Sequence, residues 1–565
     1  MPRILLYLLL IVAVVALALL SQCFPLKFLP VYHLAAPTIS LATLPQFGPG
    51  TTIVDAPDRF VLRKDVFRGV IYKASGGMWA EDTTAHWNVD LNPALRPPAA
   101  LRVVADSLFL PGGGASDSSL AVFRDTTFSV FAFNGFGSSG VRTLERITGH
   151  STSHLLDRQV NFAARVRAGQ GSPPRYAVTG GGGKFKMSFG DAGRLIAYSG
   201  VWRKIDGIAT RAWIIPRWQA NRKFRRLMRH QNLLSFDATL EYYSAPAPEA
   251  QNYLYPVYVF RGTEIVDGEP APMPQIILAA AHLSIPGITP SPPPDPPRSE
   301  SDQPVEGWDD PEPEGQTSDS HPEVGASWQG VETGGLLESG ENVAGLLAKL
   351  TAKGWTNNFG EDNWGETNAW ASDWKTDRAT WADAADLMYF KGHAYSKSWN
   401  LWTKMGSVPD GVAVKDLDTT GDKHGMWGEH DLEWIAIDGC GPLQDTAIGD
   451  ESEDALENWR GAFGGLHMLL GFATTSLSES YQGGYFAQYA LDGETVLHAW
   501  FRAALEAQVP VVGGGDPSDI VAAAMYAYYK GNSTETTKND HLWGCGFVAR
   551  DPADPDYYEL TWTSL

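Results

Sequence analysis

The chain has 565 residues, of which 44% are hydrophobic and 11% aromatic. This composition excludes a disordered protein, and the length favours two or more domains. The formal net charge of −21 at pH 7 argues against nucleic acid as a partner, because no overall positive charge offsets phosphate repulsion.

The first 23 residues predict export. Arg3 precedes an uninterrupted apolar stretch over residues 4–20, which is typical of a secretory signal peptide or a short signal anchor. This stretch is at the lower limit of length for crossing a bilayer, so both interpretations stay open. We expect a secreted protein, or one that touches a membrane only through residues 4–20.

Export affects how two features near the C-terminus are interpreted. Asn532 opens the sequence Asn-Ser-Thr, which is a glycosylation acceptor in a eukaryotic host. Cys440 and Cys545 are the only cysteines after Cys23, and in an oxidising compartment they would most simply form one disulfide. Such a bridge would close a loop of about a hundred residues and stabilise the fold by roughly 4–5 kcal/mol.

Residues 48–285 predict an α+β domain with an antiparallel sheet. β-rich runs bounded by turn residues predict its strands, which are residues 175–179, 184–189, 195–198, 236–243 and 254–260. A hairpin turn is expected at residues 190–193, and helices at residues 99–108 and 151–167. The domain carries no catalytic motif, and it distantly resembles the propeptide-like domains that precede some secreted peptidases.

A basic cluster lies within this domain, from the residue before Trp218 to the residue before His230. Its members are Arg217, Arg222, Lys223, Arg225, Arg226 and Arg229. It is either a solvated helix face or a docking surface for the acidic half of the molecule. Residues 286–321 then form a linker, rich in proline and in Asp and Glu, which cannot bury a core. We expect this linker to be disordered or polyproline-like.

Residues 322–565 predict a second, α/β domain. Its first strand is expected at residues 325–330, and residues 342–353 carry a helical stripe of apolar residues. Further helices are expected at residues 457–472, 496–507 and 517–529. Strands that alternate with helices imply a mainly parallel sheet.

Two apolar runs in this domain end in reactive side chains. Residues 384–392 lead to His393, and residues 432–439 lead to Cys440. Each run has the length, the β-branched or aromatic content and the glycine exit of a buried parallel strand. Because ligand chemistry gathers at the carboxyl ends of such strands, the sequence predicts a cysteine nucleophile and its base at one edge of the sheet.

This order of strand, histidine, strand and cysteine resembles the caspase–haemoglobinase fold of cysteine peptidases, which includes caspases, legumain, gingipains, separases and CHAT-domain proteases. The resemblance implies that Cys440 attacks a carbonyl carbon and that His393 moves the proton. More closely, the tryptophan-rich segment before His393, together with the sequence that follows Cys440, resembles an uncharacterised family of secreted proteins with no settled activity.

The same resemblance suggests which groups surround the dyad. The Cys440 amide is a candidate oxyanion donor, and Gly392, Gly439 and Ala394 are further oxyanion or pocket candidates. Related enzymes place glycine after the histidine, whereas here Gly392 precedes His393 and Ala394 follows it. Asp438 matches the acidic residue of the metacaspase pattern, which favours a basic side chain at the cleavage site; alternatively it is a strand-end carboxylate satisfied by the backbone.

We expect no metal and no other cofactor. Residues 416–422 resemble the start of a calcium loop, but Trp427 occupies the twelfth position, where a bidentate glutamate is required. His424, His430 and Asp431 lie nearby in the sequence with a spacing that fits no zinc signature well.

Tryptophan raises a different possibility, since 14 of the 20 fall within residues 322–565. Several of them, such as Trp364, Trp370, Trp374 and Trp381, lie among polar residues. They are either core anchors or an exposed surface that stacks on glycans or peptides.

Two functions therefore follow from the sequence. The first is a secreted or membrane-tethered cysteine peptidase-like hydrolase that uses Cys440 and His393 on a peptide or protein substrate, with residues 48–285 covering the acidic domain as an inhibitor. The second is a non-catalytic secreted protein in which a tryptophan-rich surface recognises glycans or peptides and Cys440 is structural.

Overall fold

The structure is a computed structural model, and it describes residues 28–35, 50–83, 95, 97, 99–101, 129–167, 175–201, 203–266, 269–281, 321–331, 333–358, 364–402, 409–413, 427–448, 453–508, 520–529, 536–552 and 554–565. The predicted leader, nearly all of the predicted linker, most of the helix expected at residues 99–108, and Asn532 lie outside these residues. Within them, no helix has both the length and the apolar character needed to cross a membrane.

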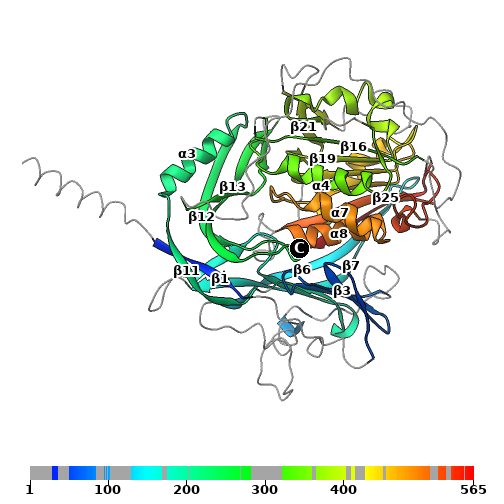
Figure 1. Cartoon of the computed structure of the whole chain (residues 1–565). Helices are drawn as coiled ribbons and strands as arrows, with labels where there is room; N and C mark the ends of the chain where they lie inside the picture. The colour runs from blue at the N-terminus through cyan, green and yellow to red at the C-terminus, as the bar shows by residue number, and fades with distance from the viewer. Residues whose placement is uncertain are drawn as a thin grey trace, which may run out of the picture.

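One large mixed sheet organises the molecule (Figure 1). Its strands, in spatial order, are β2 (Thr52–Asp55), β3 (Arg59–Lys64), β4 (Phe67–Tyr72), β5 (Met78–Asp82), β10 (Leu195–Gly200), β9 (Lys184–Phe189), β7 (Ser151–Arg167), β6 (Ser129–Glu145), β26 (Tyr557–Ser564), β25 (Val521–Tyr528), β24 (Met468–Phe472), β23 (Trp434–Asp438), β19 (Leu387–Lys391) and β16 (Glu323–Trp328). The short strands β17 (Thr356–Asn357) and β18 (Trp364–Gly365) lie beside β16. Because β26 pairs with β6 along its length, the two predicted domains share one hydrogen-bonded sheet.

The sheet continues through β8 (Arg175–Thr179) into a further group of strands. These strands are β1 (Phe28–Leu34), β11 (Ile205–Trp213), β12 (Leu233–Tyr243), β13 (Tyr253–Val266), β14 (Glu269–Pro272) and β15 (Ile276–Ala279). Helix α3 (Arg217–Leu227) packs on them through the buried residues Ala220 and Phe224. Its other residues carry the predicted basic cluster, and Arg222, Lys223 and Arg226 are exposed, as expected of a solvated helix face.

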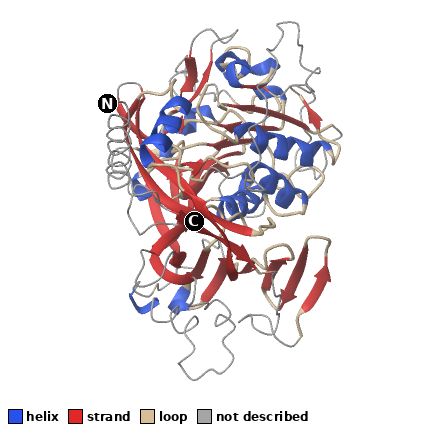
Figure 2. Ribbon diagram, turned by 60° about the vertical axis from the view of Figure 1, so that its left-hand side comes forward, coloured by secondary structure: helices blue, strands red, loops and turns tan. Residues whose placement is uncertain are grey.

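Strands β16, β19, β23 and β24 are parallel, as predicted for the region that carries His393 and Cys440. Every residue of these strands is buried, because a parallel sheet of this kind is covered on both faces. Helices α4 (Ser339–Thr351), α7 (Gln482–Leu491) and α8 (Val496–Ala507) cover one face (Figures 1 and 2). The apolar stripe predicted for the first of these helices lies in the core beneath it.

Tryptophan side chains fill much of the other face. Trp399 is completely buried, and its ring centroid lies 5.2 Å from that of Trp374, 5.7 Å from that of Trp427 and 5.9 Å from that of Trp459. Trp370 is also buried. These residues are core anchors, so the glycan- or peptide-binding surface that the sequence offered as an alternative would have to be built without them.

Two helix predictions are wrong because tertiary burial overrides local propensity. Residues 151–167 form the long strand β7, held between β6 on one side and β9 and β8 on the other. Residues 521–528, predicted as part of a helix, form β25 between β24 and β26. The alanines of β25 favour a helix in isolation, but here their small side chains fit a strand that is buried over almost its whole length.

The helix predicted at residues 457–472 is wrong over most of its length. Helix α6 (Ala455–Trp459) and a 3₁₀ turn are followed by Gly464 and Gly465, and the chain then enters β24. Gly465 allows a close approach, since a Cβ there would lie 2.0 Å from the carbonyl oxygen of Gly428. The helix predicted at residues 496–507 is confirmed as α8.

His467, directly before β24, gives the fold a measurable pH dependence. Its Nδ1 lies 2.7 Å from Asp540 Oδ2 and its Nε2 lies 3.2 Å from Asp551 Oδ1. Burial opposes the charged ring, but the two carboxylates prevail and raise its pKa from 6.5 to about 9. A raised histidine pKa stabilises the fold fully below pH 6.5, and the stabilisation is lost as the pH rises through 9.

We therefore expect the difference in unfolding free energy between the wild type and His467→Gln to shrink by about 1–3 kcal/mol between pH 6 and pH 9.5. Urea unfolding of both proteins at the two pH values measures it. A difference that is the same at both values would contradict a charged His467.

Candidate active site around Cys440 and His393

His393 and Cys440 follow two neighbouring parallel strands, β19 and β23. In the register of β19 and β23, Lys391 lies opposite Asp438, so the loops that carry His393 and Cys440 leave the same edge of the sheet. A Cβ at Gly439 would lie 2.6 Å from the carbonyl oxygen of Gly392. Only glycine permits this approach, which brings the two exit loops into backbone contact.

Both ring nitrogens of His393 have acceptors. The side chain is completely buried; its Nδ1 lies 3.0 Å from Glu264 Oε1 and its Nε2 lies 2.8 Å from the carbonyl oxygen of Gly334. Burial lowers the pKa of His393, but the charge of Glu264 and the hydrogen bonds to both partners outweigh burial and raise it. Acceptors at both ring nitrogens and the raised pKa both favour the doubly protonated imidazolium.

Cys440 is buried as a neutral thiol. Its Sγ accepts a hydrogen bond from the Ser476 amide at 3.3 Å and lies 3.8 Å from Ser476 Oγ. Burial raises the pKa of Cys440 to about 12, although the Ser476 contacts oppose the shift. Across the described chain, no hydrogen bond links Cys440 to His393.

The disulfide considered from the sequence is absent. Cys440 and Cys545 are both free, because they lie in different surroundings. Cys545 Sγ is near the carbonyl oxygen of Leu491, at 3.7 Å, at the end of α7.

The predicted oxyanion and pocket residues are partly engaged. The Gly392 amide donates to the Asp438 carbonyl at 3.2 Å, and the Gly439 amide donates to the Ile437 carbonyl at 3.0 Å. Ala394 lies in the short strand β20 (Ala394–Tyr395), which pairs with β21 (Ser398–Trp402). No described residue accepts a hydrogen bond from the Cys440 amide, so this amide is the donor available to an oxyanion.

Asp438 belongs to a buried polar network that the sequence did not reveal. Its carboxylate pairs with Lys391 Nζ at 2.8 Å, and accepts hydrogen bonds from Tyr389 Oη at 3.0 Å and Asn342 Nδ2 at 3.1 Å. The carboxylate is therefore engaged by side chains within the protein. This interior ion pair lies at the ends of β19 and β23, where the two exit loops begin.

Glu479 adds a second carboxylate to this network. Its Oε1 lies 2.9 Å from Asn342 Nδ2 and 3.7 Å from Lys391 Nζ. Burial raises the pKa of Glu479 to about 7, although Lys391 opposes the shift. The strand register is the signal that could have revealed the ion pair, since it places Lys391 opposite Asp438; Glu479 and Asn342 carry no such signal.

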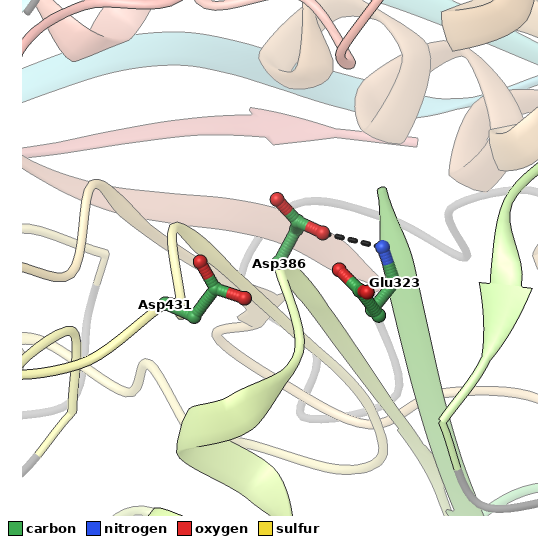
Figure 3. Close-up of side chains that lie close together, drawn as sticks. All are labelled: Glu323, Asp386 and Asp431. Atoms are coloured by element: carbon green, nitrogen blue, oxygen red, sulfur yellow. Dashed lines mark hydrogen bonds between the residues drawn. The ribbon is translucent and has the colours of Figure 1, made fainter. Parts of the chain in front are cut away.

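A separate acidic cluster lies at the opposite end of the same strands. Glu323 opens β16, Asp386 directly precedes β19, and Asp431 lies shortly before β23 (Figure 3). One ligand atom from each lies within 4.8 Å of the others, and all three residues are buried. Oxygen ligands of this kind suit Mg²⁺ or Ca²⁺, but they are at the amino ends of the strands, away from Cys440.

Asp431 was considered from the sequence together with His424 and His430, and the structure places it instead with Glu323 and Asp386. His424 and the calcium-like loop at residues 416–422 lie outside the described residues.

Residues 324–564 match a family described as a domain of unknown function, DUF6345. The match covers the region with β16, β19, β23 and the Cys440 and His393 loops, and it agrees with the predicted resemblance to an uncharacterised family. No curated protein matches the chain. Glu264 lies outside the matched region, and neither spacing nor motif pointed to it.

The free thiols can be checked by timed alkylation with iodoacetamide and mass spectrometry of the native protein. We expect Cys545, which is half-buried, to be labelled at least about tenfold faster than Cys440, because Cys440 is buried and burial raises its pKa to about 12. A peptide pair joined by a Cys440–Cys545 disulfide would contradict the structure.

The buried ion pair gives a second expectation. Lys391→Met should lower the unfolding free energy by about 3–5 kcal/mol, because it leaves Asp438 buried without its cation. Adding Asp438→Asn should restore part of this loss, since the unpaired charge is then removed. Denaturant unfolding of the two variants tests the pair, and an equal loss in the single and double variants would show that the charge is not the cause.

Proposed function

We propose that the protein is a cysteine hydrolase of the peptidase type, in which Cys440 is the nucleophile and His393 the base. The observation that carries this proposal is the contact between two strand-exit loops, one ending in an imidazole and the other in a thiol. The order of the parallel strands β16, β19, β23 and β24 is compatible with the caspase–haemoglobinase layout that the sequence resembles. Export through residues 1–23 and a peptide or protein substrate are parts of the same proposal.

His393 has a partner that sets its tautomer. The carbonyl oxygen of Gly334 accepts from Nε2, and a carbonyl cannot donate, so the Nε2 proton stays in place. Once Nδ1 is released from Glu264, burial favours the neutral ring. Nδ1 then has the lone pair that a base requires.

In the reaction, the thiol proton passes to His393 Nδ1 and the thiolate of Cys440 attacks the substrate carbonyl carbon. The Cys440 amide donates to the oxyanion. Collapse of this intermediate breaks the carbon–nitrogen bond, and His393 returns its proton to the leaving amine. Water, deprotonated by Nδ1, then hydrolyses the thioester to release a carboxylic acid and the thiol.

Two features assist the thiolate. The Ser476 amide donates to Cys440 Sγ, and the positive charge of Lys391 also lowers the pKa of Cys440, although in the buried state these effects are smaller than desolvation. When substrate enters, its carbonyl lies next to the thiol. The Ser476 amide and Lys391 then stabilise the negative charge that forms on sulfur.

A library of internally quenched peptides, incubated with the full chain, tests the proposal. Cys440→Ala and His393→Ala should each lower turnover at least about a hundredfold, because the dyad acts as a unit. Cys545→Ala is the matched control, and it should keep the wild-type rate. Turnover by Cys440→Ala at the wild-type rate would refute the role of this thiol.

A further inference from the structure

Glu264 reaches the candidate site from outside the matched region. It lies near the end of β13, where it pairs with Leu233 of β12 and Ala271 of β14. Its exposed fraction is 1%, and its carboxylate accepts a hydrogen bond from His393 Nδ1. A segment some 130 residues earlier in the chain therefore occupies the nitrogen that the proposed reaction needs.

The same carboxylate acts on the other groups of the site. After burial, the charge of Glu264 is the next largest cause that raises the pKa of Tyr395, and it also contributes to the raised pKa of Cys440. Glu264 therefore contacts His393 and Tyr395, and its charge also acts on Cys440. A negative charge here opposes formation of the thiolate, and it keeps His393 in the protonated form, which has no lone pair for the thiol proton.

A second contact comes from the same hairpin region. Gln275, between β14 and β15, forms a parallel bridge with Leu477. The main-chain N–H of Gln275 donates to the main-chain carbonyl of Ser476 at 2.9 Å, and the main-chain N–H of Ser478 donates to the main-chain carbonyl of Gln275 at 3.0 Å. Ser476 is also the residue that contacts Cys440 Sγ. Gln275 therefore uses the main-chain groups, next to the thiol, that an extended peptide would use by strand addition.

Arg261 connects the strand that carries Glu264 with Gln275. From β13 it donates to Gln275 Oε1 at 2.9 Å, and its Nη1 pairs with Glu241 Oε1 of β12 at 2.8 Å. Arg261 is therefore on the same strand as Glu264, which caps His393, and its side chain holds Gln275, which covers Ser476.

We propose that residues 261–266 and 269–275, which carry Glu264 and Gln275, are an internal inhibitor of the candidate active site. Glu264 occupies the proton-accepting nitrogen of His393, and Gln275 occupies the main-chain position beside Cys440. Displacement of this segment activates the enzyme. The inference rests on the proposed function, and it goes further by naming the inhibitory residues and the groups that they block.

The test compares Glu264→Ala and Glu264→Gln with the wild type in the full chain. Two rates are measured: iodoacetamide alkylation of Cys440, followed by mass spectrometry, and hydrolysis of the quenched-peptide library. We expect both rates to rise at least about tenfold in Glu264→Ala. A similar rise in Glu264→Gln would show that the charge of the carboxylate, more than its bulk, holds the site closed.

The matched controls are Glu81→Ala and Glu81→Gln. Glu81 is another buried carboxylate of the N-terminal region, and it pairs with Arg68 at 2.6 Å. Both control variants should keep the wild-type rates. If circular dichroism shows that the Glu264 variants are unfolded, Arg261→Gln provides the test, because it loosens the segment and leaves Glu264 in place; it should raise both rates by a smaller factor.

Three outcomes separate the inferences. Faster alkylation together with faster, Cys440-dependent hydrolysis supports the internal inhibitor. If the wild type hydrolyses the peptides and folded Glu264 variants do so at the same or a lower rate, the internal inhibitor is overturned but the proposed hydrolase is not. A lower rate would assign Glu264 to orienting His393. Absence of Cys440-dependent hydrolysis in the wild type and in folded Glu264 and Arg261 variants overturns both proposals.

Discussion

The geometry of the candidate site depends on one close approach between two backbone loops. Gly439 faces the carbonyl oxygen of Gly392 so closely that no side chain fits between them. Below this contact, the Lys391–Asp438 ion pair joins the last residues of β19 and β23. A buried ion pair of this kind adds little net stability, but it is costly to break on one side. We infer that it favours a single register, and the observed register places the imidazole loop beside the thiol loop.

The shared sheet explains why the N-terminal region takes part in the site. Because β6 pairs with β26, main-chain hydrogen bonds fix the N-terminal region against the matched region. It also supports the loop that sets the tautomer of His393. Leu336 packs in the same core cluster as Phe224 of α3, and a Cβ at Gly335 would lie 2.7 Å from the carbonyl oxygen of Leu227. The matched region alone would lack both this support and Glu264.

The two ends of the parallel strands differ in electrostatic character. At the carboxyl ends, Lys391 balances part of the charge of Asp438 and Glu479, and an imidazolium faces Glu264. At the amino ends, Glu323 and Asp386 lie together with Asp431. Cys440, the proposed nucleophile, therefore lies at the end where buried cations accompany the carboxylates, and these cations are the groups that can stabilise negative charge during the proposed reaction.

The sequence by itself determined the local features. Short apolar runs with glycine exits predicted β19 and β23, and the apolar stripe predicted α4. His393 and Cys440 were chosen as candidate residues because they directly follow the two runs. These features depend on neighbours in the chain, so periodicity and composition reveal them.

Only the tertiary structure decided the rest. The alanine-rich β25 became a strand because two neighbouring strands were available to pair with it, and tryptophans from polar stretches became buried because distant segments covered them. Glu264 meets His393 across 129 residues. Such contacts depend on the tertiary packing of segments that are distant in the sequence, and a local sequence pattern does not reveal that packing.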